Sequence, residues 1–272
     1  KILLVDEKFT LENLEISLDK NVLPLVLNST QLNETTLLAL LQTSGANITL
    51  CATRLSKGNE DAIALLNAIF ERKFNKKAIL VAFDKENLEK ALKECEFIDD
   101  LRFDLPQHPM LKREHFAKRL LHIVENDDLG VVESGEWLRY GQVRVNETNC
   151  TLCLACVGAC NVGALVADSK DNSLKFNASL CTTCGYCVAS CAEKDTIELE
   201  RSGIELKASY FHFHTLAHDE LFACMECGKE FATKKAVERV ANLMKDKFAG
   251  NERKLKTLYC CAECKARLMI FS

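Results

Sequence analysis

Short apolar runs alternate with helical patterns over the first hundred residues. Four of these runs are nearly uniformly apolar and short enough for buried strands: Lys1–Val5, Val22–Leu27, Ile48–Ala52 and Lys77–Phe83. Three further segments carry apolar residues at helical spacing: Asn33–Gln42, Asn59–Phe74 and Asp84–Glu94. Buried strands that alternate with helices are typical of a parallel sheet, so we expect a small parallel-sheet α/β scaffold domain over residues 1–98.

A linker with one amphipathic helix is predicted over residues 99–141. Pro106 and Pro109 interrupt regular structure at its start. Leu111–Glu125 then places apolar residues on one helix face and basic residues on the other: Lys112, Arg113, Lys118 and Arg119. Residues 1–129 contain no glycine-rich phosphate-binding motif. These parts are therefore predicted to be scaffold or docking elements.

The pattern then repeats with a period of 31 residues. Val143–Asn146 corresponds to Leu174–Asn177, and Leu165-Val166 corresponds to Thr196-Ile197. Between these positions each copy carries four cysteines: Cys150, Cys153, Cys156 and Cys160 correspond to Cys181, Cys184, Cys187 and Cys191. Each copy is predicted to form a strand, a cysteine loop, a short helix and a second strand. Two such copies can bury each other's faces and form one compact domain over residues 142–202.

Both copies have the cysteine spacing C-x2-C-x2-C-x3-C. Thiolate sulfur is the soft ligand of iron–sulfur clusters, and closely spaced loop cysteines offer three sulfurs to one cluster face. Disulfides or zinc are the alternatives, and the duplicated spacing disfavours both. The eight cysteines therefore predict two [4Fe-4S] clusters. Such clusters indicate a reducing, cytoplasmic compartment.

This segment resembles the bacterial two-[4Fe-4S] (dicluster) ferredoxin family over about residues 142–200. The resemblance implies that the fourth cysteine of each run binds the cluster of the other run. Cluster 1 is then bound by Cys150, Cys153, Cys156 and Cys191, and cluster 2 by Cys181, Cys184, Cys187 and Cys160. The runs end in Cys160-Asn161 and Cys191-Ala192 instead of the usual Cys-Pro, which removes a fixed φ but no ligand.

Two further C-x2-C pairs, separated by 33 residues, give residues 203–272 a second metal signature. Four sulfurs at this spacing suit a structural zinc ion, Zn²⁺, while a third iron–sulfur cluster or metal-free cysteines are the alternatives. The predicted ligands are Cys224, Cys227, Cys261 and Cys264. Cys260 is expected to be a spare thiol. We call this region the four-cysteine module.

A helix is predicted between the two pairs of the four-cysteine module, over Thr233–Phe248. Thr233 is expected to cap its start and Gly250 to end it. Its expected apolar stripe consists of Val237, Val240, Ala241 and Met244.

A closer resemblance covers about residues 140–268. Cys150–Cys160, Cys227–Lys234 and the final C-x2-C resemble bacterial 4Fe-4S proteins associated with formate dehydrogenase and other molybdenum or tungsten enzymes. The resemblance implies a redox-enzyme partner such as formate dehydrogenase. Because such proteins are often longer at the N-terminus and this chain begins at Lys1, we expect further residues upstream.

Composition and charge narrow the classes of function. The chain has 272 residues, a formal net charge of −4 and a hydrophobic content of 48%, which is typical of a soluble globular protein. Thr148–Ala167 is uncharged, but its four cysteines explain this better than a membrane span does. Three lysines against six acids in Cys150–Glu200 disfavour nucleic-acid binding. From Cys224 onward, 11 Lys or Arg against six acids indicate either a docking surface for an acidic partner or a solvated helix face.

Other residues with reactive side chains are expected to be structural. Cys51 and Cys95 are predicted to be small buried hydrophobic residues. Three histidines lie close together in the sequence: His212, His214 and His218. They could bind a metal or relay protons, but we expect ordinary packing or linker roles.

The sequence therefore predicts an α+β protein with an N-terminal α/β domain, a dicluster ferredoxin-like domain and a C-terminal four-cysteine zinc-binding module. The leading hypothesis is an electron-transfer protein or subunit of an oxidoreductase. No catalytic triad or open metal site indicates a stand-alone catalyst. The alternatives are a maturation, assembly or docking factor for a molybdenum or tungsten enzyme, and a nucleic-acid-binding redox sensor that only the basic tail favours.

Overall fold

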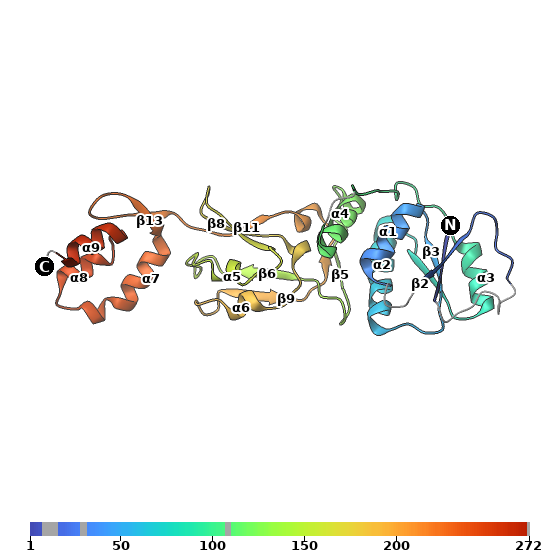
Figure 1. Cartoon of the computed structure of the whole chain (residues 1–272), viewed down its shortest axis with the longest axis horizontal. Helices are drawn as coiled ribbons and strands as arrows, with labels where there is room; N and C mark the ends of the chain where they lie inside the picture. The colour runs from blue at the N-terminus through green and yellow to red at the C-terminus, as the bar shows by residue number, and fades with distance from the viewer. Residues whose placement is uncertain (7–15, 28–31, 107–109, 271–272) are drawn as a thin grey trace. The chain divides into compact units, whose positions relative to one another are not determined.

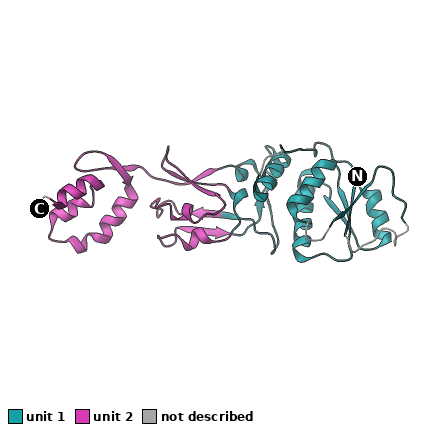
Figure 2. Cartoon of the chain, viewed as in Figure 1, with its two compact units in different colours: residues 1–142, 178–183, 201–212 teal, residues 143–177, 184–200, 213–272 magenta. Residues whose placement is uncertain are grey.

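The computed structural model describes residues 1–6, 16–27, 32–106 and 110–270 (Figure 1). These residues form two compact units (Figure 2). Unit 1 consists of residues 1–142, 178–183 and 201–212, and unit 2 of residues 143–177, 184–200 and 213–272. Pro109, one of the two predicted helix-stopping prolines, lies outside the described residues.

Unit 1 contains a four-stranded parallel sheet, as the apolar runs predict. Its strand order is β2 (Leu23–Leu27), β1 (Ile2–Asp6), β3 (Ile48–Cys51) and β4 (Ile79–Ala82). Strands β1 and β3 are buried along their whole length, which explains why their sequences are nearly uniformly apolar. Strand β2 lies at the edge, where Leu23 and Val26 are exposed. The predicted and observed strand bounds agree within two residues.

The three predicted helices of the α/β domain are confirmed. They are α1 (Glu34–Ser44), α2 (Lys57–Phe74) and α3 (Lys85–Glu94). Figure 1 shows α1 and α2 on one side of the sheet and α3 on the other. Polar side chains cap their first turns, because Asn33, Ser56 and Asp84 each accept a backbone N–H. Cys51 and Cys95 are both buried, as predicted.

The amphipathic linker helix is α4 (Lys112–Val124), and it buries Phe116, Leu120 and Ile123. One residue differs from the prediction. Arg119 is buried rather than solvated, and its guanidinium donates to the side-chain oxygen of Gln42 (2.9 Å) and to the Phe103 carbonyl (3.0 Å). The buried charge is thus paired with oxygen acceptors, which satisfies its donors inside the fold.

Unit 1 ends in a small two-stranded sheet and two short 3₁₀ helices. Strand β5 (Val131–Val132) pairs antiparallel with β10 (Ile204–Glu205), and the 3₁₀ helices are η3 (Ala178–Leu180) and η4 (Ala208–Phe211). Gly203 precedes β10 with φ of +91°, and a Cβ at this position would lie 2.1 Å from the Val132 carbonyl oxygen. Only glycine fits this close approach of the two strands.

Unit 2 contains the duplicated element pattern that the 31-residue repeat predicts. The first copy has β6 (Gln142–Val145), α5 (Ala155–Gly158) and β7 (Leu165–Asp168), and the second has β8 (Ser173–Phe176), α6 (Tyr186–Ala189) and β9 (Ile197–Glu200). The copies interlock, because β6 pairs with β9 and β7 pairs with β8. Strand β11 (His214–His218) pairs antiparallel with the other edge of β8.

The described part of the four-cysteine module consists of a hairpin, three α-helices and one 3₁₀ helix. These are β12 (Leu221–Ala223), β13 (Glu230–Thr233), α7 (Lys234–Met244), the 3₁₀ helix η5 (Asp246–Phe248), α8 (Glu252–Thr257) and α9 (Ala262–Ile270). The predicted helix over Thr233–Phe248 is therefore divided into α7 and η5. Val237 and Ala241 are buried as expected, whereas Val240 is exposed, so the predicted apolar stripe is narrower.

Candidate iron–sulfur and metal sites

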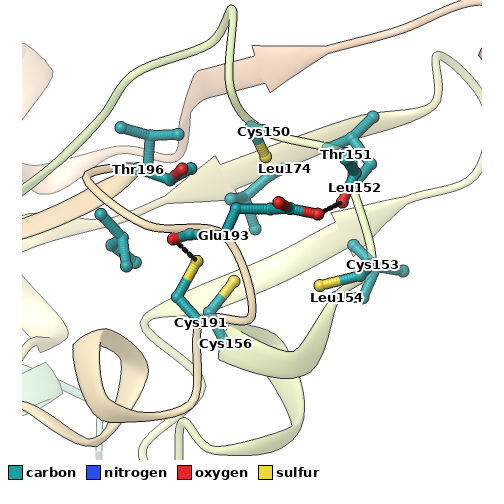
Figure 3. A pocket seen from close by; sticks show the side chains of 12 residues that line it. Cys150, Thr151, Leu152, Cys153, Leu154, Cys156, Leu174, Cys191, Glu193 and Thr196 are labelled. Atoms are coloured by element: carbon teal, nitrogen blue, oxygen red, sulfur yellow. Dashed lines mark hydrogen bonds between the residues drawn. The ribbon is translucent and has the colours of Figure 1, made fainter. Parts of the chain in front are cut away.

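Four cysteines of unit 2 line one pocket (Figure 3). Cys150, Cys153 and Cys156 come from the first cysteine loop and the start of α5, whereas Cys191 follows α6. The structure thus brings the fourth cysteine of the second run to the first three cysteines of the first run. The other lining residues are largely apolar, with Glu193 as the one carboxylate among them.

The cysteine loops turn through left-handed backbone positions. Leu152 and Leu154 have φ of +51° and +60°, and the corresponding residues Thr183 and Gly185 have φ of +48° and +86°. Non-glycine residues in this conformation cost about 1 kcal/mol or more each. In the first loop these left-handed residues lie on either side of Cys153. The resulting turns accompany the approach of Cys150, Cys153 and Cys156 to one pocket.

Burial in the pocket holds its thiols in the protonated form while no metal is bound. Burial raises the pKa of Cys156 to about 11, and the neighbouring Cys150 and Cys153 add to the rise. Burial also raises the pKa of Cys150, while the backbone N–H of Leu152 opposes this change. Without metal these thiols stay protonated at neutral pH, so binding of iron must displace the protons. The donor set of four soft sulfurs in an apolar pocket fits an iron–sulfur cluster.

Three of the other four cysteines also approach one another within unit 2. The pKa of Cys187 is raised, first by burial and then by the nearby Cys184 and Cys160. Cys181 belongs to unit 1, where its sulfur accepts the Thr183 backbone N–H at 3.3 Å. The two groups in unit 2 are neighbours, because α5 packs against α6 and Cys187 adds to the rise in the pKa of Cys156.

The four-cysteine module gathers its four predicted ligands tightly. The sulfurs of Cys224, Cys227, Cys261 and Cys264 all lie within 4.8 Å of one another. Cys227 is exposed and the other three are buried. Among the described residues no other three or more His, Cys, Asp or Glu side chains gather their ligand atoms this closely.

Backbone donors prepare one thiol of the four-cysteine module for deprotonation. Burial raises the pKa of Cys224, but the N–H groups of Cys261, Cys227 and Glu226 outweigh it and lower this pKa to about 6. The Cys261 N–H lies 3.3 Å from the Cys224 sulfur. Cys260 packs in the same buried cluster as Cys224, Cys261 and Cys264, and its thiol donates to the Lys256 carbonyl (3.3 Å).

Helix α7 of the four-cysteine module contacts the first cysteine loop. The Thr233 hydroxyl donates to the Thr151 carbonyl (3.0 Å) instead of capping α7, contrary to the sequence-based expectation. Lys235 Nζ donates to the Glu147 carbonyl (2.7 Å), and Arg239 Nε lies 3.0 Å from the Glu193 carboxylate. No sequence pattern indicates these contacts, since each joins positions far apart in the chain.

The three histidines singled out by the sequence are exposed. His214 and His218 are exposed on β11, and the His214 ring lies edge-on to Phe176 with 5.9 Å between centroids. His212 is exposed at the end of η4 in unit 1. Within the described ranges, no helix is both long and apolar enough to span a bilayer.

A comparison with known protein families finds a match in the duplicated segment. Residues 142–192 match the family model of the 4Fe-4S dicluster domain, and the match includes all eight cysteines of the two runs. The chain carries a ferredoxin-type iron–sulfur domain. None of the curated proteins matches the chain. The ferredoxin-type domain indicates electron transfer and a redox partner.

Proposed function

We propose that the chain is an electron-transfer protein or subunit with two [4Fe-4S] clusters. The proposed ligands are Cys150, Cys153, Cys156 and Cys191 for cluster 1, and Cys181, Cys184, Cys187 and Cys160 for cluster 2. The observation that carries the proposal is the presence of Cys191 in one pocket with the first three cysteines of the other run. This arrangement agrees with ligation that crosses between the two copies.

The protein's own residues hold the clusters, limit the access of water and offer routes to the surface. Each cluster, when bound, supplies a one-electron redox couple. Cys150 and Cys187 are buried, whereas Cys153 and Cys184 are exposed. Each ligand set therefore reaches from the protein interior to its surface. The contact of α5 with α6 makes the two sets neighbours, which supports electron movement between them.

We also propose a structural zinc ion at the four-cysteine module, bound by Cys224, Cys227, Cys261 and Cys264. The close spacing of the four sulfurs supports one ion over a third cluster. Backbone N–H groups lower the pKa of Cys224 to about 6 and favour a thiolate there. Burial and the neighbouring sulfurs raise the pKa of Cys264 to about 12, so zinc has to displace that proton.

The proposed partner is a cytoplasmic redox enzyme, with formate dehydrogenase favoured by the resemblance of residues 140–268. Electron transfer by two clusters requires neither residues 1–98 nor the four-cysteine module. Additional domains suit docking to a fixed partner, because docking geometry then selects where the electrons go.

The test combines anaerobically purified protein with formate dehydrogenase and formate. We expect a complex in size-exclusion chromatography and bleaching of the visible cluster absorbance after addition of formate. A matched Cys156→Ala variant should show weaker bleaching, because it lacks one cluster 1 ligand. A complex without bleaching would favour the assembly or docking factor. Intact clusters that stay oxidised, without a complex, would exclude this dehydrogenase as the partner.

A further inference from the structure

Glu193 places a carboxylate at the pocket of cluster 1. Its side chain is 16% exposed and lines the pocket together with the four cysteines. The carboxylate accepts the Thr151 hydroxyl at 3.4 Å, and the Glu193 backbone carbonyl accepts the Cys191 thiol at 3.3 Å (Figure 3). Because Cys191 loses its proton when it binds iron, the Thr151 hydroxyl is the one of these two contacts that can persist beside a bound cluster.

Arg239 of α7 neutralises this carboxylate. Its Nε lies 3.0 Å from the second carboxylate oxygen of Glu193, and half of the arginine side chain is exposed. Helix α7 does not depend on this ion pair for its position. The Thr233 hydroxyl and Lys235 Nζ also bind the cysteine-loop backbone, and the Lys235 backbone N–H donates to Asp219 (2.8 Å). Removal of the guanidinium should therefore change charge without displacing the helix.

We propose that Arg239 acts through Glu193 as a positioning residue that sets the reduction potential of cluster 1, an inference that rests on the proposed function. Reduction adds one electron to a site that four thiolates already make negative. An unpaired carboxylate beside that site disfavours the added electron, and a paired arginine offsets this effect. The four-cysteine module thus supplies a charge that the ferredoxin-type domain needs.

The first copy of the repeat provides an internal comparison. The position that corresponds to Glu193 in the first copy is Val162, two residues after Cys160. A valine carries no charge, so cluster 2, which Cys160 is proposed to bind, has no counterpart of the Glu193–Arg239 pair at this position. The effect should therefore be confined to one of the two clusters.

The experiment is a redox titration of the full chain with both clusters loaded, followed by electron paramagnetic resonance. Arg239→Gln should lower the reduction equilibrium constant of one step about tenfold, which equals about 59 mV for one electron. The other step should stay unchanged. Arg239→Lys should keep the wild-type value, and the double variant Arg239→Gln/Glu193→Gln should return close to it. Lys247→Gln removes the same charge from the exposed η5 and serves as the control.

Three results would overturn the inference: no shift in Arg239→Gln, an equal shift of both steps, or no recovery in the double variant. A solely structural role of Arg239 predicts the last of these, because Glu193→Gln cannot repair a lost contact. A wild-type chain that binds no iron would overturn the proposed function and this inference together. Full clusters that do not respond to charge at position 239 would overturn this inference alone.

Discussion

The sulfur of Cys227 lies 3.8 Å from the sulfur of Cys261, so the two C-x2-C pairs of the four-cysteine module meet. A zinc–sulfur bond is about 2.3 Å long, and tetrahedral geometry then separates two ligand sulfurs by about 3.8 Å. The observed spacing therefore matches one ion. A cluster with four irons needs its ligand sulfurs further apart than this.

We predict one zinc per chain, and its loss in Cys227→Ala. Metal binding contributes directly to the stability of such small modules, so the loss should expose α7 and the helices after it to limited proteolysis. Elemental analysis and a protease time course measure both effects. Cys260→Ala, which leaves all four proposed ligands in place, should keep the zinc. About four additional irons and no zinc would show that the site holds a third cluster.

A second prediction concerns the iron and sulfide of the ferredoxin-type domain. Two complete clusters require about eight irons and eight sulfides per chain. Colorimetric iron and sulfide assays on anaerobically purified protein give this number. Cys51→Ala should not change it, since Cys51 is buried in the parallel sheet of unit 1. A count near four with all eight cysteines present would refute the presence of two clusters.

A third prediction concerns the stability of unit 1. The hydroxyl of the buried Tyr140 donates to the buried Glu34 carboxylate at 3.2 Å. Tyr140→Phe removes this donor and leaves the acid with its contact to Lys112. The free energy of unfolding should fall by about 1–3 kcal/mol in denaturant titrations. Tyr186→Phe, at an exposed site, should change it by less than about 0.5 kcal/mol. Equal effects of the two variants would contradict a stabilising role for the Tyr140–Glu34 contact.

The parts of the fold that sequence predicts well are those with a local signal. Strands β1 and β3 were predictable because buried parallel strands are apolar at nearly every position. The interlocked copies of the ferredoxin-type domain were predictable because the cysteine spacing repeats. In each case the residues that determine the element lie within a short segment.

Contacts between distant residues had no such signal. The sequence places Arg119 on the solvated face of its helix, yet its partner Gln42 lies 77 positions away. The sequence predicts a helix cap at Thr233, but its hydroxyl binds Thr151, which lies 82 positions away. A polar side chain can bind its own helix or a remote loop, and only the tertiary structure determines which. The Glu193–Arg239 pair remained unidentified for the same reason.

The last prediction tests whether ligation crosses between the two copies. Cys191 lies with the first cysteine run, whereas Cys160 lies near Cys187. Single substitutions cannot show which cluster is lost, but pairs of substitutions can. If ligation crosses, Cys160→Ala/Cys187→Ala removes two ligands of cluster 2 and should leave about four irons per chain.

The matched pair Cys160→Ala/Cys156→Ala removes one ligand from each cluster under crossed ligation, so it should leave almost no iron. Alanine is used because a serine hydroxyl can replace a thiolate as a ligand. If each run instead bound its own cluster, the two results would be reversed, since Cys156 and Cys160 would then share a cluster. Iron counts on the two double variants therefore decide between the two arrangements, and a reversed result would refute the proposed ligand sets.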